Sequence, residues 1–224
     1  MTNERESRTD RAARRRSEIL TAAQNVFARD GYHGAKLTAV AAEAGCSVGT
    51  LYTYFTDRSA LLGAVLDDVE EQMRHPGGRL PADRPVAEQI SAANRGYLAA
   101  YRRNNRMMAL MEQVSMADES VAARRARRAD GFIERNARAL TRYLDQGTVV
   151  GIEDPELIAT ALSASVSRLA YLTWVEGRFP DTDETFSRVC AAADTIWFRT
   201  LGLEEPEEPK EMEEPEDVSP RFVK

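Results

Sequence analysis

Apolar residues recur every three or four positions along most of this chain, with charged residues between them. This period is typical of amphipathic helices, and no stretch alternates between apolar and polar residues as a half-buried strand would. We therefore expect an all-α protein of about nine helices. The pattern places them at residues 13–30, 37–44, 47–55, 58–75, 85–105, 107–114, 118–146, 154–176 and 181–202.

The stretch 31–62, GYHGAKLTAVAAEAGCSVGTLYTYFTDRSALL, predicts two short helices joined by a tight turn. Gly45 follows the first helix, where a helix end favours a residue that tolerates positive φ. Ser47 is a good N-cap for the second helix, whose Leu51 and Phe55 can pack back on the first. Two short helices around a tight turn are typical of a helix-turn-helix DNA reader, whose second helix enters the major groove.

The segment GCSVGTLYTYFTDRSALL resembles the signature of TetR-type transcriptional regulators, in which a glycine, a serine, GTLY, a second tyrosine and a phenylalanine recur in this order. The preceding AQNVFARDGYHGAKLTAVAAEAG is similar to the first two helices of the same pattern. The resemblance implies an N-terminal three-helix helix-turn-helix domain followed by a helical ligand-binding and dimerisation domain. It also implies a homodimer that binds a palindromic operator on double-stranded DNA and is released by a small-molecule effector.

The resemblance further implies which residues contact DNA. Hydroxyl groups and Arg58 are expected on phosphates, which fixes the register on the duplex without reading sequence. Base readout is expected from Val48, Thr50, Thr53 and Tyr54. The full set of expected contacts is Lys36, Thr38, Ser47, Val48, Gly49, Thr50, Tyr52, Thr53, Tyr54 and Arg58.

Two positions depart from the family pattern. Val48 stands where the family often has a polar or charged residue, and an apolar side chain can sense a thymine methyl group but cannot read guanine. Lys36 stands where a Ser or Thr cap is common, so either the helix lacks a side-chain cap or Lys36 gains a phosphate contact. Of Tyr52 and Tyr54, we expect one to be partly structural.

The net charge of -6 is unevenly distributed along the chain. Residues 1–60 hold nine Lys/Arg and seven Asp/Glu, residues 61–202 hold eighteen and twenty, and residues 203–224 hold three and nine. The basic excess therefore coincides with the DNA-reading motif, and the acidic excess lies mainly in the proline-interrupted end. We expect a disordered basic arm at 1–12, a DNA-binding domain at 13–60, a ligand-binding and dimerisation domain at 61–203 and a disordered acidic tail at 204–224. The arm either contacts DNA or is a solvated leader, and the tail is expected to act as a solubilising segment.

The last two long helices are predicted to form the dimer surface. The segment ELIATALSASVSRLAYLTWV is apolar or small nearly all round, so it needs cover on two sides. The final helix carries one apolar face, and the alternative is that this face belongs to a large single-chain core. Its members are Phe186, Val189, Cys190, Ala193, Ile196, Trp197 and Leu201.

Aromatic and methionine residues on the middle helices are candidates for the effector site, since pockets are mostly apolar with a few polar anchors. Arg168 stands in an otherwise apolar helix, so its charge needs a carboxylate partner, a route to water or an acidic ligand. We expect an apolar or amphipathic effector of moderate size. The candidate residues are Tyr97, Tyr101, Met108, Met111, Glu112, Phe132, Arg168, Tyr171 and Trp174.

Other chemistry has little support in the sequence. Cys46 and Cys190 lack metal or redox spacing, and His33 and His75 are isolated, so we expect no metal, no cofactor and no catalytic residues. No apolar run reaches membrane-spanning length and no signal peptide is recognisable, which favours a cytoplasmic protein without a membrane partner. The alternative to a regulator is a helical carrier or enzyme for a hydrophobic metabolite. Against an enzyme, no nucleophile–base pair or phosphate loop stands out.

Overall fold

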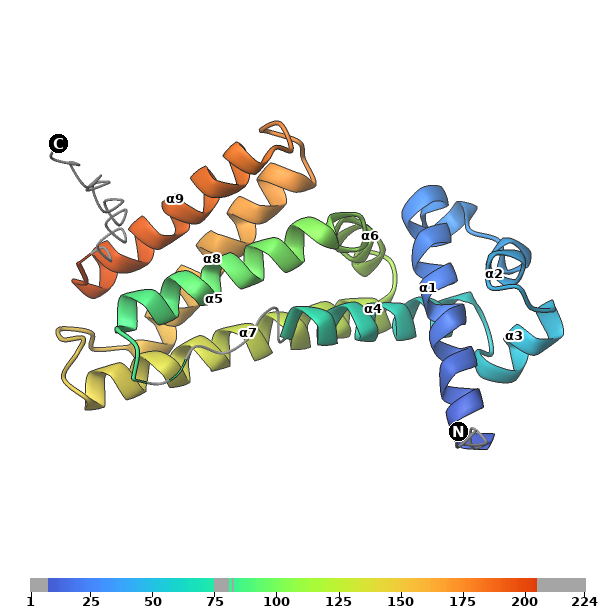
Figure 1. Ribbon diagram of the computed structural model, residues 1–224, viewed down its shortest axis with the longest axis horizontal. Helices are drawn as coiled ribbons and strands as arrows, with labels where there is room; N and C mark the ends of the chain where they lie inside the picture. The colour runs from blue at the N-terminus through green and yellow to red at the C-terminus, as the bar shows by residue number, and fades with distance from the viewer. Residues whose placement is uncertain (1–7, 75–80, 82, 205–224) are drawn as a thin grey trace, which may run out of the picture.

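The computed structural model describes residues 8–74, 81 and 83–204. All regular structure in this part of the chain is helical, which confirms the predicted fold class (Figure 1). The first seven residues of the predicted basic arm and the predicted acidic tail from residue 205 onward lie outside the described residues.

Three helices form the N-terminal unit: α1 (Arg8–Gly34), α2 (Leu37–Glu43) and α3 (Val48–Tyr54). The prediction that residues 8–12 belong to a disordered arm is wrong, because α1 begins at Arg8 rather than near residue 13. Asp10 lies in the first turn, where a negative charge favours the helix, and arginine is itself a good helix former. Further along, the Glu18 carboxylate pairs with both Arg14 and Arg15.

Gly31 interrupts α1 where the sequence predicted its end. Its backbone has φ 69° and ψ 175°, a conformation that is open to glycine and strained for residues with a Cβ atom. The break redirects Tyr32 and His33 away from the axis of α1. Together with the start of α4 (Arg58–Arg74), these two residues form the joint between the N-terminal unit and the rest of the chain.

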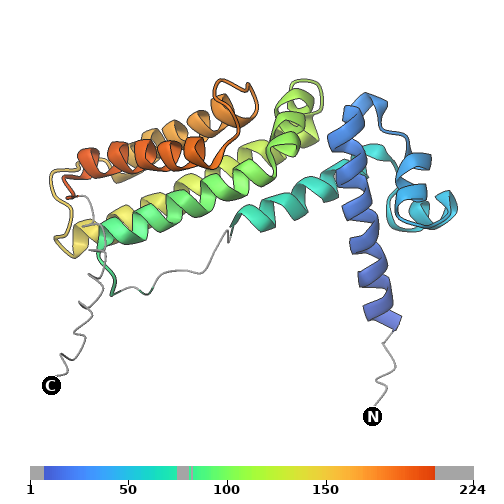
Figure 2. The same ribbon diagram turned by 45° about the horizontal axis from the view of Figure 1, so that its top comes forward.

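α1 lies across the start of α4, and the remaining helices form an elongated body with α4 (Figures 1 and 2). They are α5 (Val86–Arg103), α6 (Asn105–Ser115), α7 (Glu119–Asp145), α8 (Pro155–Trp174) and α9 (Asp183–Leu201). The starts of α7, α8 and α9 are capped by Asp118, Asp154 and Thr182. None of the described helices is both long enough and apolar enough to cross a bilayer.

A sharp corner at Asn104 separates α5 from α6. The Asn104 side chain is buried, donates to the Ala100 carbonyl (3.0 Å) and accepts from Gln24 Nε2 on α1 (3.3 Å). Because a buried amide needs hydrogen-bond partners, this residue fixes the corner and ties it to the N-terminal unit.

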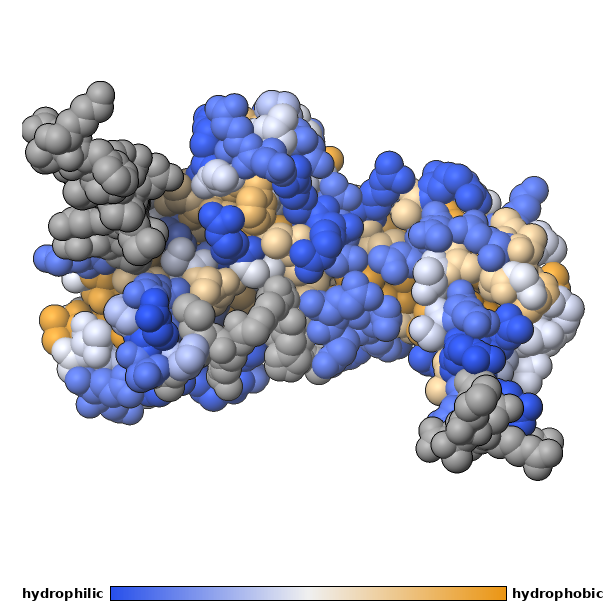
Figure 3. All heavy atoms as spheres, viewed as in Figure 1, coloured by the Kyte–Doolittle hydropathy of each residue, from blue (hydrophilic) through white to orange (hydrophobic). Residues whose placement is uncertain are grey.

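The apolar face of α9 packs inside the chain, so its assignment to the dimer surface is wrong for most of its members. α9 packs along α5, and side chains on α5 bind it across the seam between the two helices. Ser91 and Asn94 donate to the Asp194 carboxylate, at 2.6 and 2.9 Å. Ile196 remains 40% exposed. Residues of the predicted face that are buried within the chain are Val189, Cys190, Ala193, Trp197 and Leu201. In Figure 3, hydrophobic atoms show through the seam between α9 and α5 on an otherwise largely hydrophilic face.

Asp118 holds the start of α7 against the start of α4. Its carboxylate accepts hydrogen bonds from the Ser120 side chain and N–H (2.7 and 2.9 Å), the Val121 N–H (3.2 Å) and Ser59 Oγ on α4 (3.1 Å). The bonds from Ser120 and Val121 favour the ionised form and hold the pKa of Asp118 below its ordinary value. Its stabilisation is therefore complete above pH 4–5 and is lost as the pH falls through the lowered folded-state pKa.

We expect Asp118→Ala to lower the free energy of unfolding at pH 7 by about 1 kcal/mol, the usual value of an N-cap. Asp118→Asn should retain most of that stability, because an amide oxygen also caps, but should lack the pH dependence of this group. Urea unfolding at pH 7 and at pH 3, at one protein concentration, measures both effects. The matched control is Asp130→Ala, an exposed carboxylate in the middle of α7. Equal stability of the Ala variant and the parent at pH 7 would contradict this role.

Candidate DNA-reading surface and effector site

The turn between α2 and α3 has the geometry of a helix-turn-helix. Gly45 adopts φ 60°, and the Cys46 N–H donates to the Ala41 carbonyl at 2.9 Å, which closes the end of α2. Ser47 then caps α3, accepting from the Thr50 N–H at 3.0 Å. The predictions made from the glycine and the serine are both confirmed by these contacts.

The faces of α3 separate packing residues from accessible ones. Leu51 is fully buried, and Val48 and Tyr54 are half-buried against the same core. Gly49 and Thr53 are exposed, and Tyr52 is 53% exposed. Tyr54 is thus the partly structural member of the tyrosine pair. The outer surface of α3 faces away from the helical body, at the end of the molecule (Figure 1).

Three hydroxyl groups along α3 form hydrogen bonds within the helix and its cap. Ser47 Oγ lies 2.9 Å from Thr50 Oγ1, and Thr53 Oγ1 donates to the Gly49 carbonyl at 3.1 Å. These contacts restrict the side chains to defined rotamers at the helix N-terminus. A helix N-terminus with available N–H groups favours an approaching anion such as a phosphate.

Lys36 precedes α2 as its N-cap, with extended backbone and no side-chain hydrogen bond to the helix. Of the two alternatives drawn from the sequence, the absence of a side-chain cap is therefore observed. Lys36 and Thr38 are both exposed at the start of α2. Their contact with phosphate stays a prediction.

Arg58 is committed to the fold in addition to any role on DNA. Its guanidinium donates to the His33 carbonyl at 3.1 Å and lies 4.5 Å from the centroid of the Tyr32 ring. A cation over an aromatic face is stabilising, so Arg58 fastens the start of α4 to the segment after the Gly31 break. No sequence pattern indicates this contact, since the His33 carbonyl lies 25 residues before Arg58 in the chain.

Two arginines of α1 lie against the turn between α2 and α3 and the residue that ends α3. Arg15 donates to the Ala44 carbonyl at 3.3 Å, next to the turn, and Arg16 lies over the Phe55 ring at 5.5 Å from its centroid. These residues extend the positive surface beside α3. The arginine spacing could have predicted that the helix begins before residue 13, because Arg11 and Arg15 share one face of a helix.

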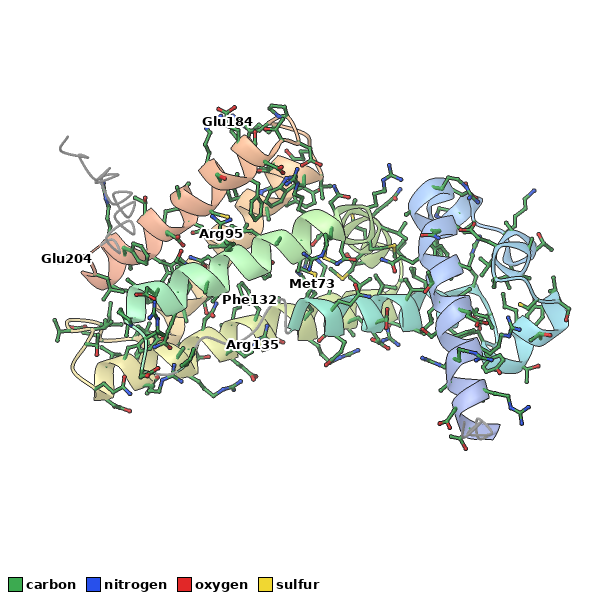
Figure 4. All side chains as sticks on the ribbon, viewed as in Figure 1. Met73, Arg95, Phe132, Arg135, Glu184 and Glu204 are labelled. Carbon is green, nitrogen blue, oxygen red and sulfur yellow. The ribbon has the colours of Figure 1, made fainter. Side chains whose placement is uncertain are left out.

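Three of the predicted effector residues come together between α5 and α7. The rings of Tyr97 and Phe132 are stacked, with centroids 4.3 Å apart and planes 9° apart, and Tyr101 lies 6.0 Å from Tyr97. Figure 4 labels Phe132 on α7 and Met73 at the end of α4, which lie near each other at this place. Burial raises the pKa of the Tyr101 hydroxyl well above its ordinary range. We call Met73, Tyr97, Tyr101 and Phe132 the aromatic cluster.

The other predicted effector residues come from α6 and α8. Met108 and Met111 are buried in α6, and Glu112 accepts from Arg125 of α7 at 2.7 Å. Trp174 is buried at the end of α8, 6.1 Å from the Phe186 ring. The structure therefore stacks three members of the predicted set, and Glu112 and Tyr171 lie close enough to act electrostatically on the Tyr101 hydroxyl.

Arg168 is exposed and has a carboxylate partner, which is one of the alternatives that the sequence left open. Its guanidinium donates to the Glu176 carboxylate at 3.1 Å and lies 4.8 Å from the Tyr171 ring centroid. The outward face of α8 meets solvent in the described chain, which gives this charge the route to water that the sequence left open.

The hollow beside the aromatic cluster is small. Its volume is about 10 Å³, and its lining includes Met73, Tyr97, Phe132 and Arg128. A single water molecule needs at least this much space, so an effector can enter only when side chains move.

The two cysteines have different surroundings. Cys46 is half-buried in the reading turn, whereas Cys190 is buried in α9, where desolvation raises its pKa to about 11. Among the described residues, no group of three or more His, Cys, Asp or Glu side chains is arranged to hold a metal ion.

Comparisons with known proteins agree with this geometry. Residues 19–65 match the family model for bacterial regulatory proteins of the tetR family. They contain most of α1, the two helices α2 and α3, which we call the reading unit, and the start of α4. The HTH-type transcriptional regulator UidR of Escherichia coli K12 is 35% identical over 57 residues, 25% of this chain and 29% of UidR. The HTH-type transcriptional repressor KstR of Rhodococcus jostii RHA1 is 34% identical over 85 residues, 35% of this chain and 40% of KstR. The matches thus span less than half the length of either relative.

A crystal structure from Mesorhizobium loti, assigned to the TetR family of transcriptional regulators, superposes with a TM-score of 0.72. The superposition covers 85% of this chain and 98% of that one at 19% sequence identity, so it supports the whole helical fold and not a shared ligand. The capped reading helix, the family model that covers it and the fold of the body lead to one assignment: residues 19–65 of this chain are a DNA-binding domain of the tetR family of bacterial regulatory proteins, carried on a helical fold shared with TetR-family regulators.

Proposed function

We propose that the protein is a dimeric DNA-binding repressor that leaves a palindromic operator when a small effector binds its helical body. The observation that carries the proposal is the outer surface of α3, which presents Gly49, Tyr52 and Thr53 at an end of the molecule. Arg15 and Arg16 extend that surface with positive charge. A helix of this size fits the major groove of B-form DNA, and the flanking arginines suit phosphates.

The burial of each side chain divides the proposed contacts into two roles. Thr53 and the edge of Thr50 are placed to read bases, while Val48 and Tyr54 present only part of their surface because they also pack on the core. Phosphate contacts are assigned to Lys36, Thr38, Ser47, Gly49, Tyr52 and Arg58. Phosphate contacts set position and orientation, and base contacts set sequence preference.

The proposed dimer uses the outer faces of α8 and α9 rather than the buried face of α9. Leu157, Ala161 and Ala164 form a stripe along α8, and Leu157 is 63% exposed. On α9, Ala192 and Ile196 are exposed four residues apart. Two-fold pairing of such faces would place the reading helices on half-sites about 34 Å apart, or one turn of DNA.

Repression is supported by the relative KstR, which is named a transcriptional repressor. Release follows from linkage: an effector that binds more tightly to a conformation with mismatched reading helices lowers the affinity for DNA by the same factor. The aromatic cluster is the proposed effector site, because it lies where the end of α4 meets α5 and α7.

We expect Tyr52 and Thr53 to affect DNA binding in different ways. Tyr52→Phe removes one phosphate hydrogen bond, so affinity should fall about tenfold per half-site with no change in the preferred sequence. Thr53→Ala should change the preferred bases. Selection of bound duplexes from a random library at fixed salt, followed by titration of the recovered operator, measures both. Gln113→Ala, exposed on α6, is the matched control. Unchanged affinity and unchanged preference in both variants would refute the proposed surface.

Adjacent residues of α9 should separate folding from dimerisation. Trp197 is buried, so Trp197→Ala should lower the free energy of unfolding by about 3–5 kcal/mol. Ile196→Glu places a charge on the exposed face and should raise the dimer dissociation constant at least tenfold while the helical content is retained. Sedimentation velocity and urea unfolding distinguish the two. If the Ile196→Glu protein is dimeric over the same concentrations as the parent protein, this part of α9 is excluded from the interface.

A further inference from the structure

Arg128 of α7 points into the aromatic cluster. Its Nη2 atom donates to Tyr97 Oη at 3.2 Å and lies 3.7 Å from Met73 Sδ. Its Cζ atom lies 6.0 Å from the Tyr97 ring centroid and 5.8 Å from that of Tyr101. A half-buried guanidinium is thus surrounded by a phenol hydroxyl, a thioether and two aromatic rings.

The described partners of Arg128 are neutral groups, whereas three other arginines of α7 pair with carboxylates. Arg124 pairs with Asp67, Arg125 with Glu112 and Arg138 with Glu134. Within the part of the chain that the structure describes, no carboxylate forms an ion pair with Arg128. A guanidinium has five N–H donors, and the described contacts of Arg128 use a single nitrogen. Glu70 also lines this hollow, but the guanidinium keeps N–H donors that the described contacts do not use. Partial burial of such donors is costly, so this position favours an anion that arrives from outside.

We propose that Arg128 is the anchor for the acidic group of the effector, and that the effector is a carboxylic acid with a flat aromatic or otherwise apolar body. The inference rests on the proposed function, since it names the ligand class of that effector site. A carboxylate matches the guanidinium fork with two parallel hydrogen bonds. The stacked rings of Tyr97 and Phe132 show that this place accepts planar groups in parallel contact.

Entry of the acid requires the cluster to open, because the hollow holds only about 10 Å³. Met73 is unbranched and flexible, and Phe132 is only half-buried, so these two side chains can move at low cost. The carboxylate of the ligand would accept the hydrogen bond that Arg128 Nη2 now donates to Met73 Sδ. The body of the ligand would replace Phe132 or lie beside it on the Tyr97 ring.

The same event would release one of three contacts that hold α4 along α7. Ser59 bonds to Asp118 at the start of α4, Asp67 pairs with Arg124 in its middle, and Met73 accepts from Arg128 at its end. Loss of the last contact frees the end of α4 while its start stays fastened to the reading unit through Arg58. Acid binding therefore biases the helix that carries the reading unit, which supplies the release step.

The test compares an acid with its neutral counterpart on the full-length protein. Calorimetric titration uses naphthalene-2-carboxylate, naphthalene-2-carboxamide and decanoate as probes. We expect at least one of the two acids to bind, and naphthalene-2-carboxylate to bind about tenfold or more tightly than the amide, the usual size of a charge-assisted contact. Arg128→Gln should abolish that preference and leave the weaker binding of the amide. Arg127→Gln, an exposed arginine on the same helix, should retain the preference.

Several results would overturn the proposal. They are equal affinity for acid and amide, retention of the preference in Arg128→Gln, and absence of binding by both acids at millimolar concentration. Thermal unfolding of each variant identifies loss of fold, and Arg128→Lys then serves as the second variant, because it keeps the charge and should keep part of the preference. Titration of the selected operator with and without the acid separates failure of the acid anchor from failure of the proposed regulator function. Acid binding without any selected operator would leave the anchor standing and refute the regulator, and operator binding without acid preference would do the reverse.

Discussion

The attachment of α4 along α7 is the contact on which the arrangement of the two parts depends. α4 follows the reading unit directly and carries it, and α7 fixes α4 at its start, middle and end. Gly63 makes the middle contact possible, because a Cβ atom there would lie 2.9 Å from the Arg124 guanidinium. A Cβ atom there would require the flexible end of Arg124 to shift from its present position beside Asp67.

The local elements could be predicted from sequence because their causes are local. Gly45 and Ser47 determine the turn and the cap by their own conformational preferences, and Asp118, Asp154 and Thr182 act on N–H groups two or three residues away. Gly31 is a similar case, although the helical segment continues for three residues beyond it. The early start of α1 was missed because the density of arginine suggested disorder, whereas arginine also favours a helix.

The partners of each face could not be predicted, since periodicity shows that a face is buried and not what covers it. The apolar face of α9 is the clearest case: Trp197 and Val189 contact the chain's own core, and only Ile196 of that set is exposed to a possible second copy. Arg168 shows the same limit, because its apolar neighbours in sequence lie on other faces of α8. The contacts of Arg58 with His33 and of Arg128 with Tyr97 join distant segments and leave no sequence signal.

The unequal burial of the two cysteines has a practical consequence. Cys190 lies in the core with a raised pKa of about 11, so its thiol stays protonated and shielded at neutral pH. Cys46 is partly accessible and sits in the turn that precedes the reading helix. A maleimide fluorophore or spin label would therefore attach to the natural sequence at one position in each chain. In the proposed dimer, the distance between the two labels would report the separation of the reading helices directly, without any engineered cysteine.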